Sequence, residues 1–123
     1  MVLGTPNRNL LVGNLESVRV VLDVRDIVVA YYLLMMTDES NGKVFNVSGD
    51  VPNKMGVYTD MLINASGITN IAKIIPEKYY RPIDIHYQHG DCTALKTITS
   101  WSPKYNIETT MNDLLEYWIK KLG

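Results

Sequence analysis

The longest run of apolar side chains lies between Ile27 and Met36, where two tyrosine hydroxyls are the only polar groups. Asp23 and Asp26 precede it at the positions of an N-cap and of a capping carboxylate, which predicts that a helix begins there. A helix that is apolar on every face is expected to be covered on both sides. The run is too short for a membrane span, which needs about twenty apolar residues. The pattern therefore predicts a buried core helix.

Five shorter runs have the composition or the alternation of β-strands. They cover residues 10–12, 16–22, 43–47, 71–75 and 83–87, and we expect 43–47 to be a central strand. Helical spacing predicts three further helices: 55–66 with Gly67 after its end, 92–99 behind Asp91, and a last one capped by Thr109. Together these elements predict an α+β fold, a single domain of residues 1–123 with a small mixed sheet and about four helices.

Length, charge and cysteine content narrow the class of protein. A chain of 123 residues fits one small domain. The net charge of −1 and the lack of a basic stripe argue against nucleic acid as a partner. The single cysteine, Cys92, cannot form an internal disulfide, and the start from Met1 to Pro6 lacks a secretory signal pattern. We therefore expect a cytoplasmic protein that is not bound to a membrane.

Groups with catalytic or metal-binding chemistry are few. His86 and His89 are the only histidines, and residues three apart in a strand face opposite sides, so no shared metal is expected. Cys92 is expected to be a structural thiol. No glycine fingerprint for a dinucleotide follows a predicted strand, and neither Tyr79 nor Tyr80 begins a Tyr-x-x-x-Lys pair. We expect no catalytic residue, no such Tyr/Lys pair and no cofactor bound by this chain.

Two arginines have surroundings that suit a phosphate. Arg19 precedes the N-terminus of the predicted helix, where free N–H groups favour an anion. Arg81 is held extended by Pro82, and its guanidinium fork can take two phosphate oxygens. Asp84 follows on the same edge and can accept hydrogen bonds from ribose hydroxyls. One interpretation is that Arg19 and Arg81 share a pyrophosphate.

Two plainer interpretations stay open for the same residues. Arg19 can pair with Asp23 or Asp26 instead of a ligand. Arg81 and Asp84 can form a surface ion pair, which would contribute little to stability.

A set of short motifs, each weak alone, runs in order along the chain from Leu10. They are Val12-Gly13-Asn14-Leu15, Arg19, Asp23 to Val28, Lys43 to Val47, Arg81-Pro82-Ile83-Asp84, Gly90-Asp91-Cys92, Ser100 to Pro103 and Leu114 to Trp118. The ordered set resembles the carboxy-terminal half of the extended short-chain dehydrogenases that act on nucleotide sugars, the NAD-dependent epimerase/dehydratase family. Within it the resemblance is strongest to the GDP-mannose 4,6-dehydratases and the GDP-6-deoxy-4-keto-mannose reductases.

The resemblance implies a fold and a site. The chain would be the nucleotide-sugar-binding lobe of a Rossmann-type enzyme, with a GDP-linked sugar as ligand. Substrate binding is implied for Asn14, Arg19, Arg81, Pro82, Ile83 and Asp84. In this assignment Asn14 and Arg19 approach the nucleotide diphosphate. Arg81 clamps phosphate, and Asp84, at the end of the Arg81–Asp84 segment, takes the ribose hydroxyls.

The sequence also departs from the family pattern. Val20 and Val21 stand where an aspartate and an aromatic residue usually follow the arginine, and Ser100 replaces a customary glycine. The glycine-rich turn and the Tyr/Lys pair of the cofactor domain, which would hold NAD(P) in the complete enzyme, are not matched. We therefore expect a substrate-binding fragment that is inert by itself and that associates with a cofactor-domain chain or with itself. The alternative is a non-enzymatic remnant that binds a nucleotide or another protein.

Overall fold

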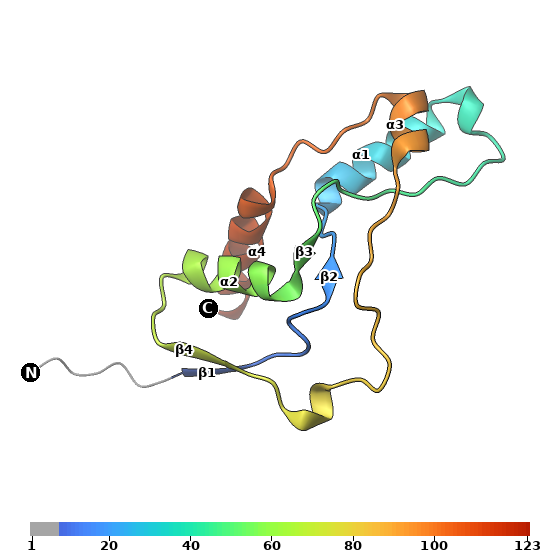
Figure 1. The fold of residues 1–123 in the computed structure, drawn as a ribbon. Helices are drawn as coiled ribbons and strands as arrows, with labels where there is room; N and C mark the ends of the chain where they lie inside the picture. Colours follow the sequence, from blue (N-terminus) through green and yellow to red (C-terminus); the bar gives the residue numbers. More distant parts are fainter. Residues whose placement is uncertain (1–7) are drawn as a thin grey trace, which may run out of the picture.

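The computed structural model describes residues 8–123, and Figure 1 shows their arrangement. Their helices are α1 (Val24–Met35), α2 (Met55–Ser66), α3 (Thr93–Thr99) and α4 (Ile107–Leu122), with the short 3-10 turns η1 (Asp38–Ser40) and η2 (Glu77–Tyr79). Their strands are β1 (Arg8–Leu11), β2 (Val18–Arg19), β3 (Asn53–Lys54) and β4 (Ile71–Ile74). The predicted α+β class with four α-helices is confirmed for these residues. The prediction about the chain's first six residues lies outside them.

The strands form one parallel and one antiparallel pair. β1 runs parallel to β4, with Arg8 opposite Ile71, and β2 pairs antiparallel with β3. Figure 1 shows α1 and α3 side by side at one end of the molecule and the β1–β4 pair at the other. Between them, α2 packs against α4. The predicted strands at 10–12 and 71–75 are thus confirmed within a residue or two, as boundaries of this kind usually are.

Two predicted strands are wrong in this chain. Residues 43–47 run extended beside α1. Their backbone N–H groups from Val44 to Val47 have no hydrogen-bond acceptor within the described chain, so they form no strand there. Residues 83–87 are irregular, and only Tyr87 forms an isolated bridge, to Val18. The predicted strand 16–22 is shortened to β2. A strand needs a neighbour for its ladder, and alternation of side chains in one segment does not supply it.

The N-terminus of α1 is fixed by two aspartates in different ways. The Asp23 carboxylate accepts a hydrogen bond from the backbone N–H of Arg25 at 2.9 Å, so the predicted N-cap is confirmed. Asp26 is buried but is not a capping carboxylate. Its oxygens accept the backbone N–H groups of Lys104 at 2.9 Å and Tyr105 at 3.1 Å, which ties α1 to the segment before α4.

The prediction that α1 is covered on both sides is wrong for this chain. One face packs into the core, whose buried residues are Ala30, Cys92, Leu95 and Trp101, with Leu22, Leu33, Leu34, Phe45 and Val47 packed against them. The opposite face carries an exposed apolar stripe at helical spacing, Val24, Val28, Tyr31, Tyr32 and Met35. We call these five residues the α1 stripe. The short α3 covers only one side of α1, and nothing in the described chain covers the other.

The remaining helices begin and end close to their predicted positions. α2 has the predicted bounds, and Gly67 adopts φ 67° directly after it, as a left-handed C-cap requires. The Asp91 carboxylate accepts the N–H of Thr93 at the start of α3, as predicted. The predicted cap of α4 is wrong, because Asn106 accepts the N–H of Thr109 at 2.8 Å and the helix begins at Ile107.

Candidate functional site

A cavity of about 590 Å³ brings the two predicted phosphate-binding arginines together. It lies between the segment that leads into β2, the first residue of α2 and the η2 turn. Its lining residues are Gly13, Asn14, Ser17, Arg19, Met55, Lys78, Tyr79 and Arg81. Arg19 and Arg81 therefore face one space although they come from distant parts of the sequence. Lys78 adds a third positive charge, which the sequence analysis did not identify.

Arg19 is held by contacts at both ends of its guanidinium group. One Nη donates to the backbone carbonyl of Val18 at 2.7 Å, and the other lies 3.4 Å from a carboxylate oxygen of Asp84. The interpretation in which Arg19 pairs with Asp23 or Asp26 is wrong. Asp23 pairs with Arg25 at 2.8 Å, and the Asp26 carboxylate accepts backbone N–H groups.

The helix start that borders the cavity is that of α2, not that of α1. Its first two N–H groups are already bonded, Met55 to the carbonyl of Ser17 and Gly56 to the carbonyl of Leu15, both at 2.9 Å. These two N–H groups are therefore not free to bind an anion. Attraction for an anion in this cavity comes from the side chains of Arg19, Lys78 and Arg81.

Asp84 stands at the edge of the cavity and is bonded to its wall. One of its oxygens accepts both the Asn14 amide and the Ser17 hydroxyl at 2.8 Å. The hydrogen bond from Ser17, followed by that from Asn14, lowers the pKa of the Asp84 carboxyl from its ordinary value against the effect of burial. The charges of Arg19 and Arg81 act in the same direction. Asp84 is therefore ionised at neutral pH.

The segment around Arg81 is placed only partly as expected. Arg81 lines the cavity, whereas Pro82 and Ile83 do not, and the side chain of Ile83 is 89% exposed. In the described chain the ion pair of Asp84 is made with Arg19, so a direct Arg81–Asp84 pair is not formed. The guanidinium of Arg81 is thus available to a ligand.

Ser17 was missed by the sequence analysis, although it is 3% exposed and bonded to Asp84. A single hydroxyl in a strand-like segment carries no pattern that distinguishes it from a surface serine. Its role depends on Asp84, which lies far along the chain and reaches it only in the folded structure.

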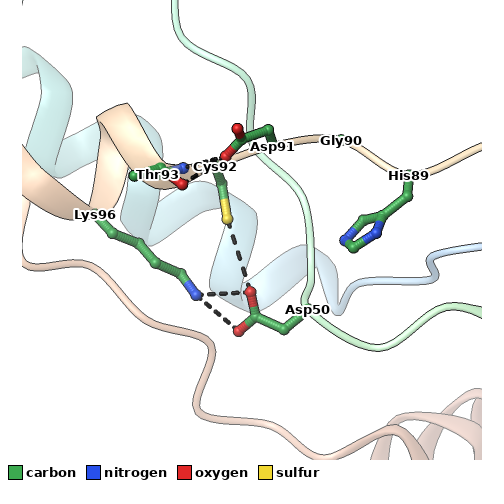
Figure 2. A pocket seen from close by; sticks show the side chains of 7 residues that line it. All are labelled: Asp50, His89, Gly90, Asp91, Cys92, Thr93 and Lys96. Carbon is green, nitrogen blue, oxygen red and sulfur yellow. Dashed lines mark hydrogen bonds and ion pairs between the residues drawn. The ribbon is translucent and has the colours of Figure 1, made fainter.

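A second, smaller cavity of about 250 Å³ lies beside α3 (Figure 2). Lys96 Nζ contacts both oxygens of Asp50 at 2.7 Å, and this bond raises the pKa of Lys96. The Cys92 thiol points at Asp50 with Sγ 3.9 Å from the nearer oxygen. The charges of Lys96 and Asp50 neutralise each other, and Cys92 is buried. This cavity therefore presents fewer unpaired polar groups to a ligand than the larger one does. In the described chain no cluster of three metal-binding side chains occurs, and His89 alone of the histidines lines this cavity.

One sequence expectation about catalysis needs correction. Tyr117 and Lys121 have the spacing of a Tyr-x-x-x-Lys pair, and Lys121 Nζ donates to the tyrosine hydroxyl at 3.3 Å. The tyrosine also packs edge-on against Trp118. Both residues lie on the exposed side of α4 and neither lines the large cavity. The pair is therefore present, and it lies on α4 apart from the large cavity.

Within residues 8–123, none of the helices combines the length and the apolar character required to cross a membrane.

Comparison with known proteins gives the family. The family model described as GDP-mannose 4,6 dehydratase matches residues 2–114. The chain belongs to this family of nucleotide-sugar dehydratases and epimerases, and the resemblance found in its motifs is confirmed.

Solved structures show the same fold. The structure of RMD from Pseudomonas aeruginosa with NADPH superposes with a TM-score of 0.83 at 24% identity, over 95% of this chain and 37% of that one. UDP-glucose 4-epimerase from Thermotoga maritima with UDP-glucose gives 0.80 at 24% identity, over 95% and 36%. dTDP-glucose 4,6-dehydratase from Bacillus anthracis with NAD gives 0.74 at 20% identity, over 92% and 35%. The chain thus spans little more than a third of the length of these structures.

Proposed function

We propose that this chain is the substrate-binding part of a nucleotide-sugar dehydratase or reductase, and that its large cavity takes the diphosphate of a GDP-linked sugar. The observation that carries the proposal is the convergence of Arg19 and Arg81 on one cavity. A diphosphate carries several acceptor oxygens on two linked groups, which suits two guanidinium forks better than one. Lys78 adds a positive charge to the cavity, but its ammonium group does not impose the planar two-bond geometry of a guanidinium group.

The ribose of the nucleotide is assigned to Asp84. Three donors already reach this carboxylate, two on one oxygen and Arg19 on the other. A carboxylate offers about four acceptor positions, so one remains beside Arg19. In the proposed complex this position accepts a ribose hydroxyl. Asn14 lines the cavity and donates to Asp84, so it orients the Asp84 carboxylate towards the diphosphate.

A nicotinamide cofactor does not fit the described residues. The dinucleotide sites of Rossmann folds use glycine-rich turns that lead into a helix with free N–H groups. Of the described helices, α2 has a glycine in its first turn, Gly56, and its N–H donates to Leu15. We therefore assign NAD(P) to the complete enzyme and no step of hydride transfer to this chain, which we expect to be inert by itself. Six of the solved structures with this fold are described with NADPH or NAD.

The second candidate function is non-enzymatic protein association. It is favoured by the α1 stripe and by the extended residues 43–47, whose backbone has no hydrogen bond within the described chain from Val44 to Val47. An exposed apolar patch marks an interaction surface, and an extended segment with unpaired backbone groups can pair with a strand of a partner. The partner would be a cofactor-domain chain or a second copy of this one.

A nucleotide panel tests the proposed ligand. Amide chemical shifts of the purified chain are followed while GDP, UDP, dTDP or GMP is added. We expect GDP to bind with a dissociation constant near millimolar, about −4 kcal/mol, because part of the cleft is not supplied by this chain. GMP, which lacks the second phosphate, should bind more weakly than GDP. Equal shifts with GMP and GDP would show that the diphosphate is not what the cavity recognises.

A further inference from the structure

Asn14, Ser17 and Asp84 form a closed triangle of hydrogen bonds at the edge of the large cavity. The Asn14 amide donates to the Ser17 hydroxyl at 2.9 Å and to Asp84 at 2.8 Å, and the Ser17 hydroxyl donates to the same Asp84 oxygen at 2.8 Å. The Asn14 carbonyl oxygen accepts the N–H of Glu16 at 2.9 Å. Both amide hydrogens of Asn14 are thus engaged within the protein.

The triangle joins the two walls that carry the arginines. Asn14 and Ser17 line the cavity and precede Arg19 in one segment, while Asp84 follows Arg81 in the other and does not itself line the cavity. Next to the triangle, the backbone of Val18 bonds on both sides to the same distant segment, accepting from Gln88 and donating to His86. Side-chain and backbone bonds together therefore hold the backbone segments that carry the two arginines against each other.

We propose that Ser17 and Asp84 are positioning residues of the diphosphate site, and that they act by holding the walls of Arg19 and Arg81 in register. This inference rests on the proposed function. Arginine is a long side chain that loses much rotamer freedom when it binds, so fixing its base before the ligand arrives strengthens binding. Ser17 is 3% exposed and does not need to touch the ligand to have this effect.

The sign of the effect separates positioning from simple electrostatics. The Asp84 carboxylate is a negative charge at the edge of an anion site, so on charge alone its removal would tighten anion binding. A contact with ribose alone would leave binding of a ligand without ribose unchanged. Positioning predicts neither tighter nor unchanged binding. If Asp84 and Ser17 position the arginines, loss of either residue weakens the binding of any diphosphate, with or without a ribose.

Inorganic pyrophosphate, which has no ribose, is the probe for this test. Its affinity is measured by chemical-shift titration for the parent chain and for Asp84→Ala, Asp84→Asn and Ser17→Ala. We expect about tenfold weaker binding in Asp84→Ala and in Ser17→Ala, and a smaller loss in Asp84→Asn, which keeps one acceptor oxygen for the triangle. Glu39→Gln, which removes an exposed carboxylate on η1, is the matched charge control and should bind like the parent.

Tighter binding in Asp84→Ala together with parental binding in Ser17→Ala would overturn the inference. A ligand-free readout keeps it separate from the proposed function. The heteronuclear NOE of Arg19 Nε should be high in the parent chain and lower in both alanine variants. If the parent chain binds neither pyrophosphate nor GDP, the proposed function fails. If the Arg19 NOE is the same in the parent and in the variants, the positioning role of Ser17 and Asp84 is refuted, whatever the ligand binding shows.

Discussion

The indole N–H of Trp101 donates to the backbone carbonyl of Asp26 at 3.0 Å, deep in the core. The carboxylate of the same aspartate accepts two backbone N–H groups just beyond the tryptophan, from Lys104 and Tyr105. One residue of α1 thus holds, through three bonds, the segment that leads to α4. Because a buried carboxylate without its donors is costly, this connection fixes where the two halves of the chain meet.

Replacing Asp26 should therefore destabilise the fold strongly. We expect Asp26→Asn to lower the free energy of unfolding by about 2–3 kcal/mol, since a hydrogen bond to a charged acceptor is lost and an amide N–H₂ faces a backbone N–H. Urea unfolding followed by tryptophan fluorescence, to which Trp101 and Trp118 both contribute, measures this change. Asp38→Asn on η1, an exposed position, is the control and should stay within about 0.5 kcal/mol of the parent. Equal midpoints for both variants would contradict the role given to Asp26.

Stability should fall as the pH is lowered, and Asp23 should cause part of that fall. The side-chain hydrogen bond from Arg25, with others from Thr110 and the backbone, holds the pKa of Asp23 well below its usual range. The folded pKa lies below the unfolded value of about 3.9, so the stabilisation is complete above that value and is lost as the pH falls below it.

The urea midpoint measured between about pH 6 and pH 2 checks this prediction. Asp23→Asn and Arg25→Gln should each reduce the loss of stability on acidification. Some loss should remain, because the pKa values of Glu16, Asp84 and Asp91 are also lowered by their hydrogen bonds. A parental acid dependence in both variants would show that the Asp23–Arg25 pair is not responsible.

The α1 stripe should make the chain self-associate. Light scattering across a dilution series is expected to give a mass above 13.9 kDa at high concentration and to approach it on dilution. Met35→Lys, which places a charge in the stripe, should shift the equilibrium to the monomer. Leu122→Lys, at an equally exposed apolar position on α4, should not. A monomer mass for the parent at every concentration would mean that the stripe needs no cover.

Local signals in the sequence predicted the elements that local interactions decide. The bounds of α2, its glycine C-cap, the Asp23 N-cap and the bond from Thr93 to Asp91 all depend on residues within a few positions. The strand at 43–47 failed because its ladder requires a neighbour that the described chain does not contain. The prediction that α1 is buried on both sides was wrong for the same reason. An apolar helix face indicates that another element should pack against it, but it does not show that this element is present in the same chain.

The residue types of a possible anion site can be read locally, from the charges of Arg19 and Arg81 and from the extended geometry before Pro82. The two arginines line one cavity, and their sharing of a pyrophosphate stays a prediction. Ser17 and Lys78 could not be identified, since each gains its place from a distant part of the chain. Asp26 was mistaken for a cap because its true partners follow Trp101.

The purified chain should show no NAD(P)-dependent conversion of GDP-mannose or of its 4-keto-6-deoxy product. The described residues offer a dinucleotide neither a glycine-rich turn nor a Tyr/Lys pair beside the cavity. Nicotinamide absorbance measures hydride transfer, and mass spectrometry of the sugar nucleotide detects dehydration. Measurable turnover by a pure preparation would contradict the assignment of the chain as a substrate-binding part alone.

Titration of GDP into the Arg81→Ala variant tests the central claim most directly, because Arg81 is the cavity arginine that is free of an internal ion pair in the described chain. Chemical shifts are followed in the parent, in Arg81→Ala and in Lys43→Ala, which removes a positive charge outside the cavity. The parent and Lys43→Ala should bind GDP alike, whereas Arg81→Ala should lose about 2 kcal/mol or more, roughly thirtyfold in affinity. If Arg81→Ala binds GDP as well as the parent does, the cavity is not the diphosphate site.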